Sequence, residues 1–161
     1  ISIHGRTRKQ MYKGEADWSL IEKTKNNPRL HIPVFGNGDL YSAKQVNQKK
    51  IYSNVDGVMI GRGAIGYPWL FNEIKEYIKT GKLIAAPSIK ERIDVVKEHL
   101  NLSVKWKGEK LGLLEMRRHY ANYFKGFKSI KNYRIQLVTC NTIGDIHEIL
   151  NDIQKYINSQ S

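Results

Sequence analysis

Short apolar runs punctuate the first half of the chain, and each run ends at a glycine or at a polar turn. A run of β-branched and aromatic residues bounded by glycine is typical of a buried strand. We therefore predict strands over Ile1–His4, Ile32–Phe35 and Val55–Ile60.

Three helices are predicted between and after these strands. Asp17 and Ser42 are helix-capping residue types, and Pro68 is tolerated in a first helical turn. Strands that alternate with helices indicate an α/β fold with a parallel sheet and right-handed crossovers. The positions expected to face inward are Trp18, Leu20 and Ile21 in the first helix, Ala43, Val46 and Ile51 in the second, and Leu70, Phe71, Ile74 and Ile78 in the third.

Three strands are too few for a parallel sheet, which needs cover on both faces and partners at both edges. We therefore expect residues 1–82 to be the last strands and helices of a (β/α)8 TIM barrel. The first residue is not Met, so we expect the chain to begin inside a longer protein, with the missing strands upstream.

From residue 83 onward, apolar residues recur at three- and four-residue spacing, which predicts helices. Ser88 and Glu91 form a capping-box pattern, and Thr142 is positioned to cap the last helix. Two further helices are expected over residues 109–125 and 130–137. We predict that residues 83–161 form an α-helical bundle domain. The expected buried positions are Ile89, Ile93, Val96, Leu100, Val104, Leu113, Met116, Tyr120, Tyr123, Phe124, Ile146, Ile149, Leu150, Ile153 and Ile157.

Two glycine-rich turns follow the second and third strands. The first glycine turn is Gly36–Asp39, and the second glycine turn is Gly61–Gly63 with Arg62 at its centre. Because the carboxyl ends of neighbouring parallel strands meet at one edge, both turns are expected to lie together. Glycines let backbone N–H groups approach an anion, and Arg62 adds a bidentate cation. The pair predicts a phosphate site, as is common after the last strands of such barrels.

Other interpretations of these residues stay open at this point. The glycines could simply close tight turns, and Arg62 could form a surface ion pair. His4, at the end of the first strand, could be satisfied by a backbone carbonyl instead of a ligand. The aromatic residues Trp69, Phe71, Tyr120, Tyr123 and Phe124 stand at helical spacing and favour a core role over base stacking.

The chain carries a formal net charge of +12, and its isoelectric point is about 9.8. Nine Lys or Arg and two acids fall between Lys105 and Arg134, so the excess is concentrated in the helical half. This excess favours a polyanionic partner, although it could also be a solvated face. The cations expected to contact RNA phosphates there are Lys110, Arg117, Arg118, Lys125 and Lys128.

Cysteine and histidine usage excludes several classes of site. The single cysteine, Cys140, rules out a disulfide framework and suits a reducing compartment, so we expect a cytoplasmic protein, with an organellar location left open. The five histidines are not at metal-ligand spacing, and we predict no metal site. No apolar stretch is long enough to span a bilayer, so no membrane association is expected.

Several ordered motifs resemble the tRNA-dihydrouridine synthases, and the bacterial B-type branch in particular. The resemblance is close over residues 1–78 and looser in the tail, where it rests on Tyr120–Gly126. The motifs are His4-Gly5-Arg6-Thr7-Arg8, then Gln10, Tyr12, Gly14 and Ala16-Asp17-Trp18, then Pro33–Asp39, Gly61-Arg62-Gly63-Ala64 and Pro68-Trp69.

The resemblance implies an FMN-containing barrel followed by a helical bundle, which uses NADPH to reduce uridine in tRNA to 5,6-dihydrouridine. It places His4 beside the flavin, Asn37, Gly38 and Asp39 under it, and Gly61 and Arg62 at the FMN phosphate. It also places the loop that holds Arg6, Arg8, Gln10 and Tyr12 within reach of tRNA.

Two functional residues of that family, a cysteine acid and a lysine that contacts flavin and substrate, belong to the upstream half of the barrel. Cys140 lies in the tail and is interpreted as a small buried residue, so no catalytic residue is assigned. We therefore expect this fragment alone not to reduce uridine. Two alternatives stay open: a dihydroorotate-dehydrogenase-like flavin barrel acting on a small molecule, and a non-catalytic RNA-binding module.

Overall fold

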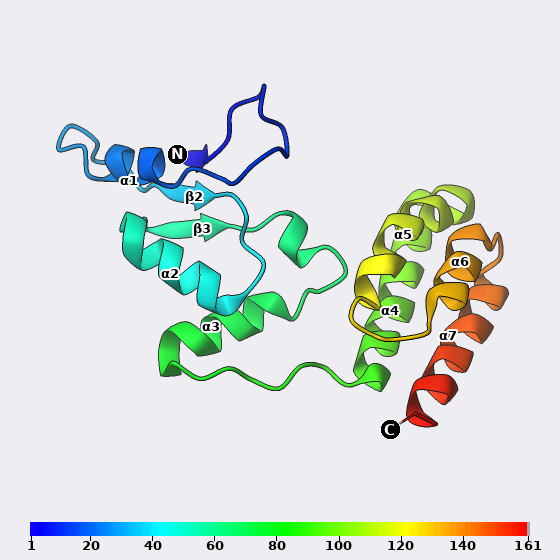
Figure 1. Ribbon diagram of the computed structural model, residues 1–161. Coiled ribbons are helices and arrows are strands. Elements are labelled where there is room, and N and C mark those ends of the chain that lie inside the picture. The colour runs from blue at the N-terminus through cyan, green and yellow to red at the C-terminus, as the bar shows by residue number, and fades with distance from the viewer. Residues whose placement is uncertain (161) are drawn as a thin grey trace. The chain divides into compact units, whose positions relative to one another are not determined.

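A computed structural model describes residues 1–160 and divides the chain into two compact units, Ile1–Ala85 and Ala86–Ser161. The first unit is α/β and the second is helical (Figure 1). In chain order the elements are β1 (Ser2–His4), α1 (Ser19–Lys25), β2 (Phe35–Asn37), α2 (Ala43–Ser53), β3 (Gly57–Met59), a 3-10 turn η1 (Arg62–Ala64), α3 (Leu70–Thr80), α4 (Ile89–Lys107), α5 (Glu109–Tyr123), α6 (Lys131–Thr139) and α7 (Ile143–Asn158).

The three strands form a parallel sheet in the order β1-β2-β3, which confirms the predicted parallel arrangement. The second strand begins later than predicted, at Phe35 instead of Ile32. Pro33 has no N–H to donate, although its carbonyl oxygen accepts from the Ile1 amino group at 2.8 Å, and Ile32 is half exposed. The Val34 N–H donates instead to the Asp56 carboxylate at 2.7 Å.

Helices α1, α2 and α3 supply the apolar cover of the sheet (Figure 1). Ser42 caps α2 as predicted, by accepting a hydrogen bond from the Gln45 N–H, and α3 ends at Gly81 in the left-handed region. The shared core consists of Ala16, Trp18, Ile21, Val34, Leu40, Ala43, Val46, Val55, Leu70 and Ile74. Four predicted core positions are wrong, because Leu20, Ile51, Phe71 and Ile78 lie on outward faces of their helices and are exposed.

The sheet also carries exposed apolar side chains. Phe35 is 43% exposed and Met59 is 51% exposed, although both lie within strands. The Phe35 ring lies against Gly57 on the neighbouring strand, where a Cβ would come within 2.5 Å of the ring. Alternate residues point to opposite faces, so these side chains lie opposite the buried core side of the sheet.

The second unit consists of four packed helices (Figure 1). Its contacts run between α4 and α5, α4 and α7, α5 and α6, and α6 and α7. Ser88 and Glu91 form the predicted capping box, and Thr142 caps α7 through the Asp145 N–H. The enclosed apolar residues include Ile93, Val96, Leu100, Leu113, Met116, Tyr120, Tyr123, Phe124, Ile146, Leu150 and Ile153, as predicted.

Two negative findings apply to residues 1–160. No helix there is long and apolar enough to cross a membrane. No group of three His, Cys, Asp or Glu residues is close enough together to hold a metal ion. The described sheet has three strands, so the complete eight-stranded barrel stays an expectation.

Candidate functional site

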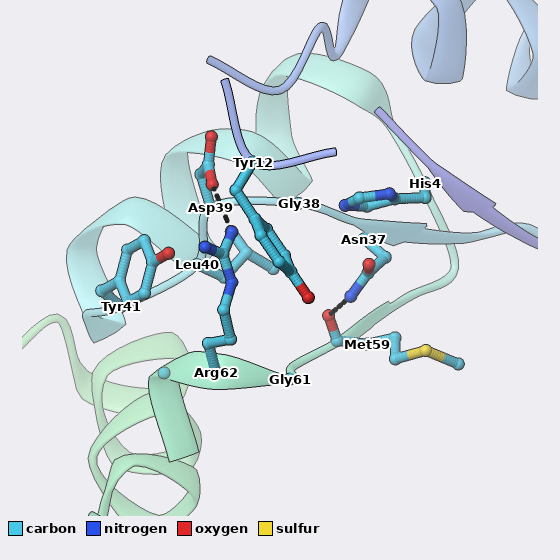
Figure 2. Close-up of a pocket in the computed structure, with 11 residues that line it drawn as sticks. His4, Tyr12, Asn37, Gly38, Asp39, Leu40, Tyr41, Met59, Gly61 and Arg62 are labelled. Carbon is cyan, nitrogen blue, oxygen red and sulfur yellow. Dashed lines mark hydrogen bonds and ion pairs between the residues drawn. The ribbon is translucent and has the colours of Figure 1, made fainter. Parts of the chain in front are cut away.

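A hollow of about 220 Å³ lies beyond the carboxyl ends of the three strands. Figure 2 shows side chains from all three strand ends turned toward it. The lining includes all six residues that the sequence nominated for a cofactor: His4, Asn37, Gly38, Asp39, Gly61 and Arg62. Tyr12, Leu40, Tyr41, Met59 and Gly63 complete it.

Two glycines allow the strand ends to approach one another this closely. At Gly63, a Cβ would come within 2.2 Å of the Leu40 carbonyl oxygen, so the second glycine turn lies directly against the residue after the first. Gly38 has a φ of 135°, and a Cβ there would come within 2.5 Å of the Ala16 Cβ. Side chains at these positions would separate the turns, because protein interiors do not accommodate such overlaps.

Asp39 binds the surrounding loops together through four N–H donors. Arg6 approaches both carboxylate oxygens, at 2.7 and 2.6 Å, and the Ala16 backbone N–H donates at 2.8 Å. The fourth and longest contact is from Arg62 at 3.2 Å. The hydrogen bond from Arg6 is the main reason that the pKa of Asp39 lies below its usual range. Asp39 is therefore a charged acceptor that orders the site.

Arg62 lies between this carboxylate and two tyrosine rings (Figure 2). Its guanidinium carbon is 4.3 Å from the centre of the Tyr12 ring and 5.9 Å from that of Tyr41. The side chain is still 41% exposed. The surface ion pair considered from the sequence does form, through a single Arg62 nitrogen at 3.2 Å from Asp39, and Arg62 also lines the hollow.

Asn37 and His4 line the opposite side of the hollow (Figure 2). The Asn37 side-chain amide donates to the Met59 carbonyl oxygen at 2.6 Å, which ties the ends of β2 and β3 together. The Trp18 indole N–H donates to the Gly38 carbonyl oxygen at 3.0 Å from the core side. The first glycine turn is therefore fixed by hydrogen bonds from both directions.

Arg6 and Arg8 occupy different environments, although both were predicted to reach RNA. The Arg6 side chain is 3% exposed and also donates to the Gly14 carbonyl oxygen at 2.6 Å. It braces the loop internally, and this geometry gives it no free face for RNA. Arg8 is exposed.

The helical unit presents the other predicted cations. Lys110, Arg118, Lys125 and Lys128 are exposed. Arg117 is partly buried. It donates to the Cys140 carbonyl oxygen at 3.2 Å and to the Asn141 side chain at 2.9 Å, so it links α5 to the segment between α6 and α7. Cys140 itself is partly exposed rather than fully buried, and desolvation raises the pKa of its thiol.

The helical unit also contains a crevice that the sequence did not suggest. His99 and His119 pack edge to face with ring centres 4.7 Å apart, and the exposed Trp106 lies at the rim. Desolvation lowers the pKa of both histidines. The spacing of these two residues along the sequence carries no signal, because they meet only when α4 and α5 pack.

Comparison with known proteins identifies relatives over nearly the whole chain. The family model described as "Dihydrouridine synthase (Dus)" matches residues 1–159. A protein of Rickettsia conorii named "Probable tRNA-dihydrouridine synthase" is 40% identical over 134 residues, which is 83% of this chain and 40% of that protein.

Two further relatives agree with this result. "Probable tRNA-dihydrouridine synthase 1" of Synechocystis sp. is 38% identical over 93% of this chain and 41% of its own length. "tRNA-dihydrouridine synthase B" of Pasteurella multocida is 34% identical over 98% of this chain and 46% of its own length. The chain thus spans less than half the length of these curated relatives. It belongs to the dihydrouridine synthase family.

Proposed function

We propose that the full-length protein containing this chain reduces uridine to 5,6-dihydrouridine in tRNA, with FMN as cofactor and NADPH as reductant. The observation that carries the proposal is the convergence of both glycine turns and Arg62 on one hollow in a chain of this family. The names of the relatives support the reaction.

The hollow suits the phosphate end of FMN. Arg62 offers a cation whose side chain is 41% exposed and makes one 3.2 Å contact with Asp39. A Cβ at Gly61 would meet nothing within 4 Å, so the turn is open at that point. Guanidinium groups bind phosphate in a bidentate manner, and open glycine turns admit an anion to the backbone. A bound flavin would supply hydride transfer, which no side chain provides.

The protein's own groups then have separate tasks. Arg62 and the Gly61 turn bind the phosphomonoester, and Asp39 keeps Arg62 and the loop after β1 in place. His4 and Asn37, on the other side of the hollow, are proposed to contact the ring portion of the flavin. These residues position a cofactor, and we assign none of them the role of proton donor.

We propose that the exposed cations of the helical unit bind the phosphates of folded tRNA. Phosphate contacts give affinity that depends on shape and salt more than on base sequence. Removing a uridine from its stack costs free energy, and contacts elsewhere on the tRNA can offset that cost. The proposed cations are Lys110, Arg118, Lys125 and Lys128, with Arg8 added from the loop after β1.

We further propose that the remaining length of the protein supplies the rest of the barrel and the catalytic cysteine and lysine. The exposed Phe35 and Met59 on the sheet support this, because parallel sheets are covered on both faces. The 161-residue chain by itself is then expected to be inactive.

The proposal is tested with the purified full-length protein, FMN, NADPH and tRNA that lacks dihydrouridine. We expect dihydrouridine to form and Arg62→Ala to lower the occupancy of FMN. The matched control is Arg29→Ala, which removes an exposed arginine that does not line the hollow. A colourless protein would argue for the RNA-binding module. Bound flavin with no salt-sensitive tRNA binding would argue for a small-molecule oxidoreductase.

A further inference from the structure

Tyr12 lies over Arg62 on the side of the hollow opposite η1 (Figure 2). The residue is 68% exposed, so burial does not explain the position of its ring. The 4.3 Å distance from the guanidinium carbon to the ring centre is well within the range of a cation–π contact. The ring contact that the structure gives Tyr12 is therefore with Arg62, the residue proposed to bind the phosphate.

The loop that carries Tyr12 is ordered by its own hydrogen bonds. Thr7 and Gln10 bond to each other in both directions, and the Lys13 N–H donates to the Gln10 carbonyl oxygen at 2.8 Å. Arg6 links the ends of the loop by donating to the Gly14 carbonyl oxygen and to Asp39. The position of Tyr12 over Arg62 is consequently set by the loop as a whole.

The loop supports Arg62 at a point where Asp39 holds it only through the longest hydrogen bond that this carboxylate accepts. Arg6 and Ala16 donate at 2.6 to 2.8 Å, whereas Arg62 donates at 3.2 Å. A phosphate dianion that enters the hollow competes with Asp39 for this guanidinium. The Tyr12 ring attracts the Arg62 cation at 4.3 Å without supplying a carboxylate or carbonyl acceptor, so this contact does not compete with an anion for hydrogen bonds from the guanidinium.

We propose that Tyr12 is a positioning residue that holds the Arg62 guanidinium for a phosphomonoester, and so sets the preference of the site for FMN over riboflavin. This inference rests on the proposed flavin function. It adds to that function a residue that contacts Arg62 and not the phosphate itself, and it gives the loop after β1 a part in binding the phosphate.

The test measures dissociation constants of FMN and riboflavin for the full-length protein after removal of its flavin. Wild-type protein is compared with Tyr12→Leu and Tyr12→Phe. Tyr52→Leu serves as a matched control, because Tyr52 is an exposed tyrosine on α2 that does not line the hollow. Thermal unfolding without flavin checks that each variant is folded.

We expect Tyr12→Leu to weaken FMN binding by about threefold to tenfold and to leave riboflavin binding unchanged. Tyr12→Phe should retain the FMN preference, because the ring face and not the hydroxyl makes the contact. Tyr52→Leu should match wild type. A role of Tyr12 in RNA binding alone would not alter this ratio of affinities.

Two results would overturn the inference while leaving the flavin function intact. One is a Tyr12→Leu variant with the full FMN preference, and the other is an equal loss of both ligands, which indicates a general loosening of the loop. A wild-type protein that binds neither flavin would instead refute the proposed function, and this inference with it.

Discussion

Arg62 and Arg92 show how differently the two units use the same residue. Both guanidiniums lie near an aromatic ring, Arg62 over Tyr12 and Arg92 at 5.1 Å from the centre of Phe127. Arg92 is 9% exposed and donates to the Tyr123 carbonyl oxygen at 3.0 Å. Arg62 has a 41% exposed side chain beside a hollow.

The difference lies in what each arginine's donors contact. Arg92 satisfies a backbone carbonyl near the C-terminus of α5, where helices leave acceptors without partners. Arg62 makes one long hydrogen bond to a carboxylate that is already well satisfied. Residue type and an aromatic neighbour therefore do not distinguish a structural arginine from one proposed to bind a ligand, whereas burial and hydrogen-bond partners do.

The largest expected effect comes from exchanging these two arginines for alanine in the full-length protein. Arg92→Ala should lower the free energy of unfolding by about 2 to 3 kcal/mol, because it removes a buried, charge-assisted hydrogen bond and the contact of the guanidinium with Phe127. Arg62→Ala should change it by less than about 0.5 kcal/mol, as exposed ion pairs usually do. Denaturant unfolding measures both changes in unfolding free energy. Equal losses for the two variants would contradict the proposed difference between a structural Arg92 and an exposed Arg62.

Asp39 tests whether the polar cluster of the α/β unit also contributes to stability. Asp39→Asn should lower the free energy of unfolding by about 1 to 2 kcal/mol at pH 7, because Arg6 and the Ala16 N–H lose a charged acceptor. Asp94→Asn, which alters an exposed pair with Lys90 on α4, is the matched control and should have little effect.

The difference in unfolding free energy between wild type and Asp39→Asn should decrease as the pH falls. The pKa of Asp39 is lowered in the folded protein, mainly by its hydrogen bond from Arg6, so its contribution is fully present above the unfolded pKa of about 3.9. The contribution is lost as pH falls through the folded pKa. The gap between wild type and Asp39→Asn should therefore close toward low pH, and a gap that widened on acidification would contradict this account.

Two tyrosines on α5 provide a smaller test within the helical unit. The Tyr123 hydroxyl lies 3.1 Å from His99 Nδ1, whereas the buried Tyr120 hydroxyl has no hydrogen-bond partner among residues 1–160. Tyr123→Phe should cost about 1 kcal/mol of unfolding free energy, and Tyr120→Phe should be neutral or stabilising. Paired unfolding curves decide this, and a larger cost for Tyr120→Phe would show that its hydroxyl has a partner in the full-length protein.

The smallest effect is expected from His99 and His119. Burial lowers the pKa of both histidines. The charge of Lys107 adds to this effect at His99. At His119, the charges of His99, Arg118 and Lys107 also lower the pKa, whereas Glu115 raises it. A group with a lowered folded pKa stabilises the fold above its unfolded pKa, about 6.5 for histidine. Stability should thus decline as pH falls below about 6.5, and His119→Gln should reduce that decline.

Local signals in the sequence determined much of the fold. The caps at Ser42, Ser88 and Thr142 and the buried faces of α4, α5 and α7 follow from residues within four positions of one another. The parallel strand arrangement follows from the alternation of runs and helices. The six nominated residues do line one hollow, because the carboxyl ends of parallel strands lie at one edge.

Tertiary structure alone decided which side chains became partners. Arg6 and Asp39 are 33 positions apart in the chain, and no periodicity pairs them or places Tyr12 over Arg62. The same holds for Arg117. The sequence places it on a basic helical face, but in the fold its side chain donates to the Cys140 carbonyl oxygen. Hydrophobic spacing encodes which face of an element is buried; the partner of a polar side chain depends on which distant backbone the completed fold brings within hydrogen-bonding distance.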